Sequence, residues 1–391
     1  MDKIFNSFFL GGFECSTQIG RYGKRHDLIS ETKHDKFARQ DYARLRKMNI
    51  GAAREGLRWH LIEKTPHKFD FTSVLPIVRA AQEHKVQILW DLFHYGFPEH
   101  VDVFDTSFIK RFADLSHSFA RFLKRETDET PFICPINEIS FFTYAAAEHG
   151  FFAPFQTKRG AEFKPHLVKA TIAVIDAFRE VAPRTRFMQI EPAVNILASP
   201  DFPHKREDAE NYRLAQYETY DYLTGRKMPE LGGNENYLDI IGVNYYKYNQ
   251  WFIAEDATLP ERSISRDEFS YRPFRDILRE IYNRYDRPMF LAETGTEDDE
   301  RAEWLGYICG EVRAALAENL PVNGICLYPI LNHPGWDDNR HCHNGLWDYA
   351  DEFGRREIYN PLAEEIRLQQ SLFEPNPSKF QTRTASAFAT A

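Results

Sequence analysis

Short apolar runs alternate with segments of helical periodicity eight times along the 391-residue chain, and this alternation limits the possible folds more than any other feature. The apolar runs, which we predict to be strands, cover residues 8–18, 50–62, 86–94, 131–139, 186–191, 238–246, 288–295 and 322–330. The predicted helices cover residues 35–48, 73–84, 108–122, 166–180, 208–223, 274–281, 301–318 and 361–373. Alternating strands and helices predict a parallel sheet, and eight such units close a (β/α)8 TIM barrel of the α/β class.

The length of the chain fits either two average domains or one barrel with long loops. No linker or break in composition divides the sequence, so we predict a single barrel domain over residues 1–373. The longer connections follow strands four, five, six and eight, and residues 145–165 are predicted to be a loop rich in Gly, Pro and aromatic residues. Residues 374–391 lack periodicity and are predicted to be a disordered tail.

The charge balance narrows the choice of partner. A net charge of -9 argues against nucleic acid and against an anionic membrane, because both require a basic surface. There is no N-terminal leader pattern and no apolar run of the roughly 18 residues that a spanning helix needs. We therefore expect a cytoplasmic protein that binds a small or neutral molecule. The five cysteines are odd in number and three lie in strand-like runs, so a disulfide framework is not expected.

Two of the predicted strands end in glutamate. One run ends in Asn137-Glu138 and another in Glu293, and each run is apolar until these final residues. This pattern is typical of parallel strands that are buried on both faces and carry function at their C-terminal ends. In a closed barrel these ends meet around one mouth, so the two carboxyl groups can face each other.

A facing pair of carboxyl groups suggests the hydrolysis of glycosidic bonds. Retaining glycosidases hold a nucleophile and a proton donor about 5–5.5 Å apart. Repulsion from ionised Glu293 would raise the pKa of Glu138, while Arg54 and Tyr246 would keep Glu293 charged. The other polar residues at strand ends are Gln18, His94, Asn137 and Tyr328. Glu191 is interpreted as a hydrogen-bonded rim residue.

Several motifs in the same order resemble those of glycoside hydrolase family 1, and they extend over almost the whole chain. They are residues 10–18 (LGGFECSTQ), 54–59 (REGLRW), 92–98 (LFHYGFP), 137–138 (NE), 242–246 (GVNYY) and 293–295 (ETG) followed by Asp298 and Asp299. The resemblance implies that Glu138 is the acid/base and Glu293 the nucleophile, positioned by Arg54 and Tyr246. It also implies that Gln18, His94 and Asn137 bind hydroxyl groups of the sugar, with Asn137 on the 2-hydroxyl.

The chain departs from the family pattern at two places. Ile139 stands where the family usually has Pro after the acid/base. The strand-eight motif reads YPILNHPGW over residues 328–336, so Trp336 is present but Gly335 replaces the Glu that would bind the far hydroxyl groups. Ordinary β-glucosidase specificity is therefore not implied, and residues 337–343 are candidates for replacement contacts. Tyr328 and Trp336 are either core aromatics or flat surfaces for sugar stacking, and we favour stacking.

Other interpretations of the same residues exist. Glu138 and Glu293 could be surface carboxyls, and Gln18, His94 and Asn137 could stabilise loops. His341, Cys342 and His343, with His333 nearby, invite a metal site. Alternate residues of a short segment rarely chelate one ion together, and retaining hydrolysis needs none, so no metal or cofactor is expected.

The resulting hypothesis is a retaining, exo-acting β-glycosidase with a small carbohydrate substrate. A transglycosylase would share every residue named above. A barrel that binds a saccharide without cleaving it is the alternative from outside the enzyme class.

Overall fold

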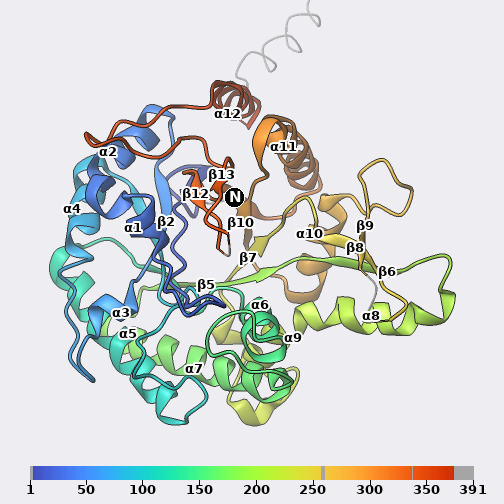
Figure 1. The fold of residues 1–391 in the computed structure, drawn as a ribbon, viewed down its shortest axis with the longest axis horizontal. Helices are drawn as coiled ribbons and strands as arrows, with labels where there is room; N and C mark the ends of the chain where they lie inside the picture. The colour runs from blue at the N-terminus through green and yellow to red at the C-terminus, as the bar shows by residue number, and fades with distance from the viewer. Residues whose placement is uncertain (1–2, 257–259, 337, 374–391) are drawn as a thin grey trace, which may run out of the picture.

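The fold is a closed barrel of eight parallel strands, described in a computed structural model for residues 3–256, 260–336 and 338–373 (Figure 1). In order around the barrel the strands are β1 (Phe9–Gly12), β2 (Ala52–Gly56), β3 (Gln87–Asp91), β4 (Phe132–Cys134), β5 (Arg186–Pro192), β7 (Ile240–Asn244), β10 (Met289–Thr294) and β11 (Val322–Leu327). The barrel closes where β1 pairs with β11, with Phe9 in register with Ile325. The predicted (β/α)8 barrel is confirmed.

Helices surround the barrel on its outer side (Figure 1). The longer ones are α2 (His34–Lys47), α4 (Leu75–His84), α5 (Ser107–Glu126), α7 (Gly160–Val181), α8 (Arg206–Leu214), α10 (Phe274–Tyr285), α11 (Arg301–Ala317) and α12 (Asn360–Phe373), and shorter ones are α1 (Leu28–Glu31) and α9 (Glu218–Leu223). Their inward faces are apolar at helical spacing. In α5, for example, Phe108, Phe112 and Phe119 are fully buried, and the helix packs against α7.

The lumen of the barrel is filled by its own cluster of buried side chains, separate from the layer between strands and helices. This cluster contains Phe5, Leu10, Ala52, Leu89, Phe132, Cys134, Met188, Ile190, Ile240, Phe290, Ala292, Cys326 and Tyr328. Burying one large apolar side chain stabilises a fold by about 1.5–3 kcal/mol. The lumen is therefore a packed core, and the polar strand ends lie above it at the mouth.

Several predicted boundaries were wrong. Residues 50–62 form only the short strand β2, and the helix α3 (Trp59–Ile62) follows it. Trp59 is fully buried because its ring stacks on Phe112 of α5, and its Nε1 donates to Oε2 of Glu63 at 2.8 Å. The apolar character of this segment thus reflects packing outside the barrel.

The predicted loop at 145–165 is partly helical. A π-helical turn covers Thr143–Glu148, and α7 already begins at Gly160. The strand predicted over 131–139 ends at Cys134, and Glu138 precedes the short helix α6 (Ile139–Phe142).

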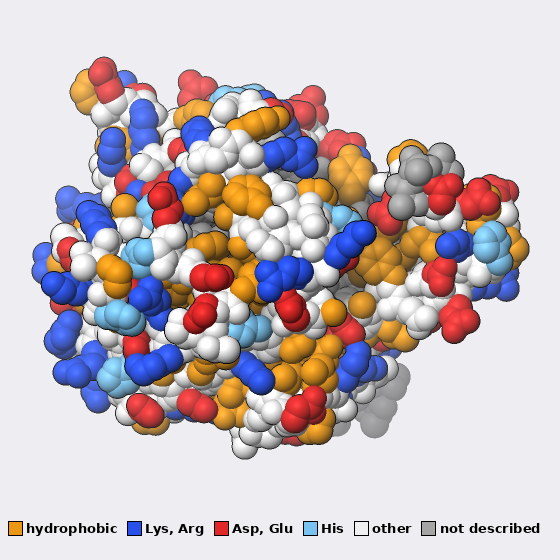
Figure 2. Space-filling model, turned by 60° about the horizontal axis from the view of Figure 1, so that its bottom comes forward, with side chains coloured by type: hydrophobic (Ala, Val, Ile, Leu, Met, Phe, Trp, Pro, Cys, Tyr) orange, Lys and Arg blue, Asp and Glu red, His pale blue; other side chains and the backbone are white. Residues whose placement is uncertain are grey.

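Two small sheets lie outside the barrel and were not predicted. The strands β6 (Asn195–Ala198), β8 (Gln250–Ile253) and β9 (Arg262–Ser263) form one of them, and with α8 they make a lobe that projects from the barrel on the right in Figures 1 and 2. The strands β12 (His333–Pro334) and β13 (His341–Cys342) form the other, next to the mouth.

Three remaining predictions concern the C-terminal tail, membrane-spanning helices and disulfide bonds. The predicted tail, residues 374–391, lies outside the described residues. Across the described residues, no helix combines the length and the apolar character needed to cross a membrane. All five cysteines are free and buried, in agreement with the prediction that no disulfide framework exists.

Candidate active site

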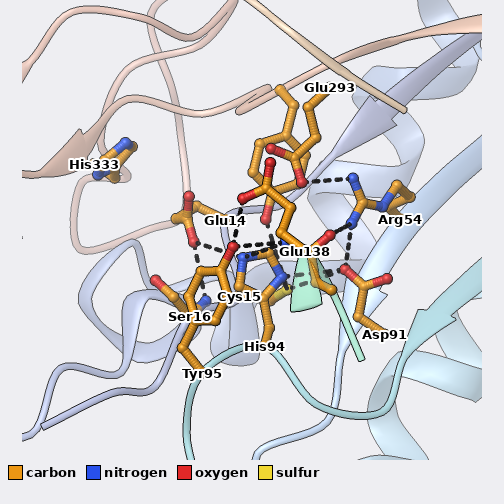
Figure 3. A network of polar contacts seen from close by, with 12 residues as sticks. Glu14, Cys15, Ser16, Arg54, Asp91, His94, Tyr95, Glu138, Glu293 and His333 are labelled. Atoms are coloured by element: carbon orange, nitrogen blue, oxygen red, sulfur yellow. Dashed lines mark hydrogen bonds and ion pairs between the residues drawn. The ribbon is translucent and has the colours of Figure 1, made fainter. Parts of the chain in front are cut away.

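The two glutamates reach the mouth from the fourth and seventh barrel strands. Glu293 is part of β10, whereas Glu138 lies four residues beyond β4, with its backbone in the left-handed region at φ 45°. Figure 3 shows both carboxyl groups in one network of polar contacts, with Arg54 and Asp91 on one side and Glu14 on the other. The barrel therefore brings together two acids that are far apart in the sequence.

Glu293 is held at both carboxylate oxygens. Nη1 of Arg54 donates to Oε1 at 2.9 Å, and the hydroxyl of Tyr246 donates to Oε2 at 2.8 Å. The other arm of Arg54 donates to Oδ2 of Asp91 at 2.6 Å; Arg54, Asp91 and Glu293 are buried, and Tyr246 is half-buried. A buried guanidinium that donates charge-assisted hydrogen bonds favours the ionised carboxylate. Arg54 and Tyr246 both contact Glu293, and Arg54 joins Glu293 to Asp91.

Glu138 has a different environment. The hydroxyl of Tyr95 donates to Oε2 at 2.6 Å, and Nδ2 of Asn244 donates to Oε1 at 2.9 Å, but no cation pairs with this carboxyl within the described residues. Burial and, secondarily, the charge of Glu293 raise the pKa of Glu138 to about 7. Glu138 can therefore hold a proton near neutral pH.

Two of the residues expected to bind hydroxyl groups, His94 and Asn137, lie beside this pair. Nε2 of His94 and Nδ2 of Asn137 are 3.3 Å apart, and Oδ1 of Asn137 accepts from Arg54 at 3.2 Å. Nδ1 of His94 faces Oδ2 of Asp91 at 3.2 Å, which fixes the imidazole ring. The backbone N–H of Thr17, next to Gln18, donates to the carbonyl of His94. The buried Oε1 of Gln18 has no hydrogen-bond partner among the described residues. An unpartnered buried acceptor is suited to a ligand.

A cavity of about 420 Å³ opens next to these side chains. Its lining includes Tyr246, Tyr328, Trp336, Gly335 and Glu14. The ring of Tyr328 lies parallel to His94 at 6.1 Å, and a side chain at Gly12 would overlap this ring, because a Cβ there would sit 2.1 Å from it. Trp336 meets Tyr95 edge to face at 5.9 Å. Tyr328 and Trp336 thus present aromatic surface to the cavity.

Sequence reasoning missed three side chains at this site, namely Tyr95, Asn244 and Glu14. Glu14 had a usable signal, because it continues the alternation of Leu10 and Gly12 on the lumen side of β1. Tyr95 and Asn244 lie inside motifs that were recognised for neighbouring residues. The contacts of Tyr95 and Asn244 with Glu138 depend on the local backbone conformation, which the alternation of apolar and polar residues in the sequence does not reveal.

Among the described residues, His341, Cys342 and His343 do not form a group of close metal ligands. Nε2 of His341 binds Oδ1 of Asp348 at 2.7 Å, and the rings of His341 and His343 stack on each other at 4.3 Å. In the part of the chain that the structure describes, one group of three possible ligands has donor atoms within 4.8 Å, namely Cys15, Asp91 and His94. Oδ2 of Asp91 already accepts from Arg54, so a second cation there would face a guanidinium.

A second and larger cavity, of about 780 Å³, is lined by residues from the start of α7 and from the projecting lobe. Its lining begins at Ser140 and Phe141, just after Glu138, and continues to Tyr212 and Trp251 on the lobe. Phe141 also contacts Tyr95 and Trp336, with ring centroids 5.5 and 6.5 Å apart. The lining of this groove therefore begins two residues after Glu138 in the chain.

The fold and the position of the acid pair define a TIM barrel with glutamates at the ends of its fourth and seventh strands. Solved structures of a family 1 β-glucosidase from Thermotoga maritima have the same fold. The complex with glucoimidazole has a TM-score of 0.76 at 15% identity, covering 94% of this chain and 99% of that chain. The complex with noeuromycin has a TM-score of 0.74 at 16% identity, covering 94% and 98%. The resemblance to the barrels of glycoside hydrolase family 1 is confirmed at the level of the fold.

Sequence comparison finds a relative that matches part of the chain. A β-galactosidase from Sulfolobus acidocaldarius is 25% identical over 253 residues, which are 56% of this chain and 50% of that protein. The chain thus spans half of the length of this curated relative. No protein-family model matches the sequence.

Proposed function

We propose that the protein is a retaining, exo-acting β-glycosidase that hydrolyses a β-linked glycoside by double displacement. The observation that carries the proposal is the contrast between the two acids. Glu293 is clamped by Arg54 and Tyr246, while the pKa of Glu138 is raised to about 7. The similarity to a β-glucosidase and a β-galactosidase supports the same reaction class.

In the first step, Oε of Glu293 attacks the anomeric carbon of the sugar, and the bond from that carbon to the leaving oxygen breaks. Glu138 gives its proton to the leaving oxygen, so the aglycone departs as a neutral alcohol. The products are a glycosyl ester on Glu293 and an ionised Glu138.

In the second step, ionised Glu138 takes a proton from water as the water oxygen attacks the anomeric carbon. The ester bond to Glu293 breaks, and the sugar leaves with its original anomeric configuration. Tyr95 and Asn244 donate to the ionised form of Glu138 and so stabilise the base that this step needs. The predicted sugar contacts, from Gln18, His94 and Asn137, place the glycone against Glu293.

A panel of nitrophenyl β-glycosides tests the proposal, with Glu293→Ala and Glu138→Ala as controls and NMR to read the anomer that forms first. We expect turnover of at least one sugar, retention of configuration, and a loss of at least about 100-fold in kcat in both variants. Inversion would contradict the double displacement. The absence of turnover with sugar binding intact would favour the silent saccharide-binding barrel.

The groove next to Glu138 also favours a second function, transglycosylation. It offers space of about 780 Å³ in which an acceptor sugar can replace water in the second step. Product analysis with added acceptor sugars distinguishes the two, because a transglycosylase forms the new glycoside faster than free sugar.

A further inference from the structure

Glu14 is a nearly buried carboxyl at the mouth that the mechanism does not use. It is 8% exposed, and it lines the same cavity as Tyr246, Tyr328 and Trp336. Its place follows from strand β1, in which Leu10 fills the lumen and Gly12 leaves room for the ring of Tyr328. Glu14 lies two residues beyond the end of β1, and its side chain lines the cavity together with Tyr328 and Trp336.

The hydrogen bonds of Glu14 leave acceptor capacity for a ligand. Oε1 accepts the N–H of Ser16 at 3.0 Å and lies 4.0 Å from Nε2 of His94 (Figure 3). An ionised carboxylate has about four lone-pair sites. Within the described residues, no lysine or arginine forms an ion pair with Glu14, and Oε2 accepts no hydrogen bond. A sugar hydroxyl that enters the cavity therefore finds a strong acceptor close to His94.

The opposite wall of the cavity supplies no equivalent group from Gly335. The N–H of Gly335 donates to the carbonyl of Arg340 at 2.8 Å, and Oδ1 of Asp338 lies 2.2 Å from the position that a Cβ at Gly335 would take. This turn fills the space in which a side chain at 335 would stand. Glu14 lines the same cavity from the segment that follows β1.

The charges around the cavity disfavour an anionic sugar. Besides Glu14, the lining contains the carboxylates of Glu297 and Asp338 and the guanidinium of Arg340. Both carboxylate oxygens of Glu297 accept from Arg340, at 2.6 and 2.7 Å, and Asp338 lies 3.4 Å from the same guanidinium. His333 uses both ring nitrogens, on the carbonyl of Pro334 and on the amide of Asn344. A phosphate or carboxylate on the sugar would thus meet like charge and a cation that is already paired.

We propose that Glu14 determines the sugar specificity of this site by accepting a hydrogen bond from a glycone hydroxyl, and that the glycone is uncharged. The proposal rests on the proposed glycosidase function for its kinetic test. A binding test keeps it independent of turnover.

The kinetic test compares the wild type with Glu14→Gln and Glu14→Ala on nitrophenyl β-glycosides that each lack one hydroxyl, and on the matching glucuronide. Glu311→Gln is the control, because Glu311 has a similarly buried carboxyl, 12% exposed, that binds Arg275 on the outer helices. For the full sugar we expect kcat/KM to fall roughly 10- to 100-fold in Glu14→Ala. For the one sugar that lacks the recognised hydroxyl, the same substitution is expected to have little further effect, because the bond is already absent. Glu14→Gln should raise the activity on the glucuronide relative to the neutral sugar.

The binding test titrates the same variants with deoxynojirimycin and with glucuronate, using calorimetry. It applies even if the barrel cleaves nothing. We expect Glu14→Gln to weaken deoxynojirimycin binding. The melting temperature of the variant protein should stay within a few degrees of the wild type. The proposal is overturned if both Glu14 variants bind and react like the wild type, if the losses are equal for every deoxy sugar, or if the wild type prefers the glucuronide.

Discussion

The hydroxyl of Tyr95 donates a hydrogen bond of 2.6 Å to Oε2 of Glu138, and both residues have a positive φ, at 62° and 45°. A residue other than glycine in this region costs roughly 1–2 kcal/mol. The two strained residues meet at one hydrogen bond, and the same hydroxyl accepts from Nδ2 of Asn137 at 3.1 Å. The backbone at the ends of β3 and β4 is thus held in the conformation that sets the environment of Glu138.

Replacing Tyr95 with Phe should move the alkaline limb of the pH–rate profile upwards. The hydrogen bond from Tyr95 lowers the pKa of Glu138, so its loss raises that pKa further. We also expect kcat to fall by no more than about 10-fold, since one hydrogen bond to a charged group is lost. Tyr237→Phe is a matched control, because it removes a hydrogen bond from tyrosine to Asp176 away from the mouth. A downward shift of the limb would contradict this role for Tyr95.

The acid form of Glu138 should control activity at alkaline pH. Because its pKa is raised to about 7, kcat/KM is expected to fall as the pH rises above about 7, where the proton for the leaving oxygen is lost. Glu138→Gln should abolish this limb and lower kcat by about 10²–10⁴-fold for poor leaving groups. With a dinitrophenyl leaving group, which departs without protonation, the loss in the glycosylation step should be far smaller. An alkaline limb that persists in Glu138→Gln would assign the titration to another group.

The same raised pKa predicts how stability depends on pH. A glutamate carboxyl titrates at about 4.3 in an unfolded chain. Between that pH and about 7, Glu138 is therefore protonated in a larger fraction of the folded molecules than of the unfolded ones. The free energy of unfolding therefore falls with rising pH across this window. Glu138→Gln, which carries no charge, should raise the free energy of unfolding above pH 7 by on the order of 2–3 kcal/mol. Denaturant unfolding at pH 5 and pH 8 measures this, and an equal change at both pH values would contradict it.

The barrel itself was predictable because its physical cause is local. A strand that is buried on both faces must be apolar until its end, and the runs that end at Glu138 and Glu293 show this directly. Closure by eight units then places the strand ends together. The positions of both glutamates at one mouth therefore follow from the alternation of strands and helices and from the number of these units.

The lobe and the neighbours of Glu138 were not predictable in this way. Strand β6 pairs with β8, so Asn195 meets Gln250 across a long stretch of chain, and neither strand is long enough to show a pattern. Tyr95 reaches Glu138 only because its backbone adopts a conformation that tyrosine rarely takes. The error at Trp59 has another origin, since an apolar residue does not reveal whether it packs inside or outside the barrel.

Arg54 should be essential for stability as well as for the position of Glu293. It is fully buried and binds Asp91 and Glu293, so Arg54→Met removes the guanidinium that these two buried carboxylates share. Removing one partner of a buried ion pair typically costs about 3–5 kcal/mol. Denaturant unfolding measures the loss. Arg39→Met is the control, because the pair of Arg39 with Glu83 is exposed and its removal should leave the unfolding midpoint unchanged. A small effect of Arg54→Met, similar to that of the control, would contradict the role of Arg54 as the shared partner of both acids.

The groove beyond Glu138 should bind the leaving group, and Trp251 tests this. The rings of Trp251 and Tyr212 meet edge to face at 6.0 Å on the wall of the groove, away from the cavity that contains Glu14. Trp251→Ala removes aromatic surface that only a large aglycone can reach. An aromatic contact is worth about 0.5–1.5 kcal/mol beyond its buried area, so we expect kcat/KM for a long or aromatic aglycone to fall roughly 10-fold. For a methyl glycoside of the same sugar, kcat/KM of the variant should equal that of the wild type, because the methyl group is too short to reach Trp251. Equal losses for both substrates would show that the substitution disturbs the catalytic pair itself and that the groove does not hold the aglycone.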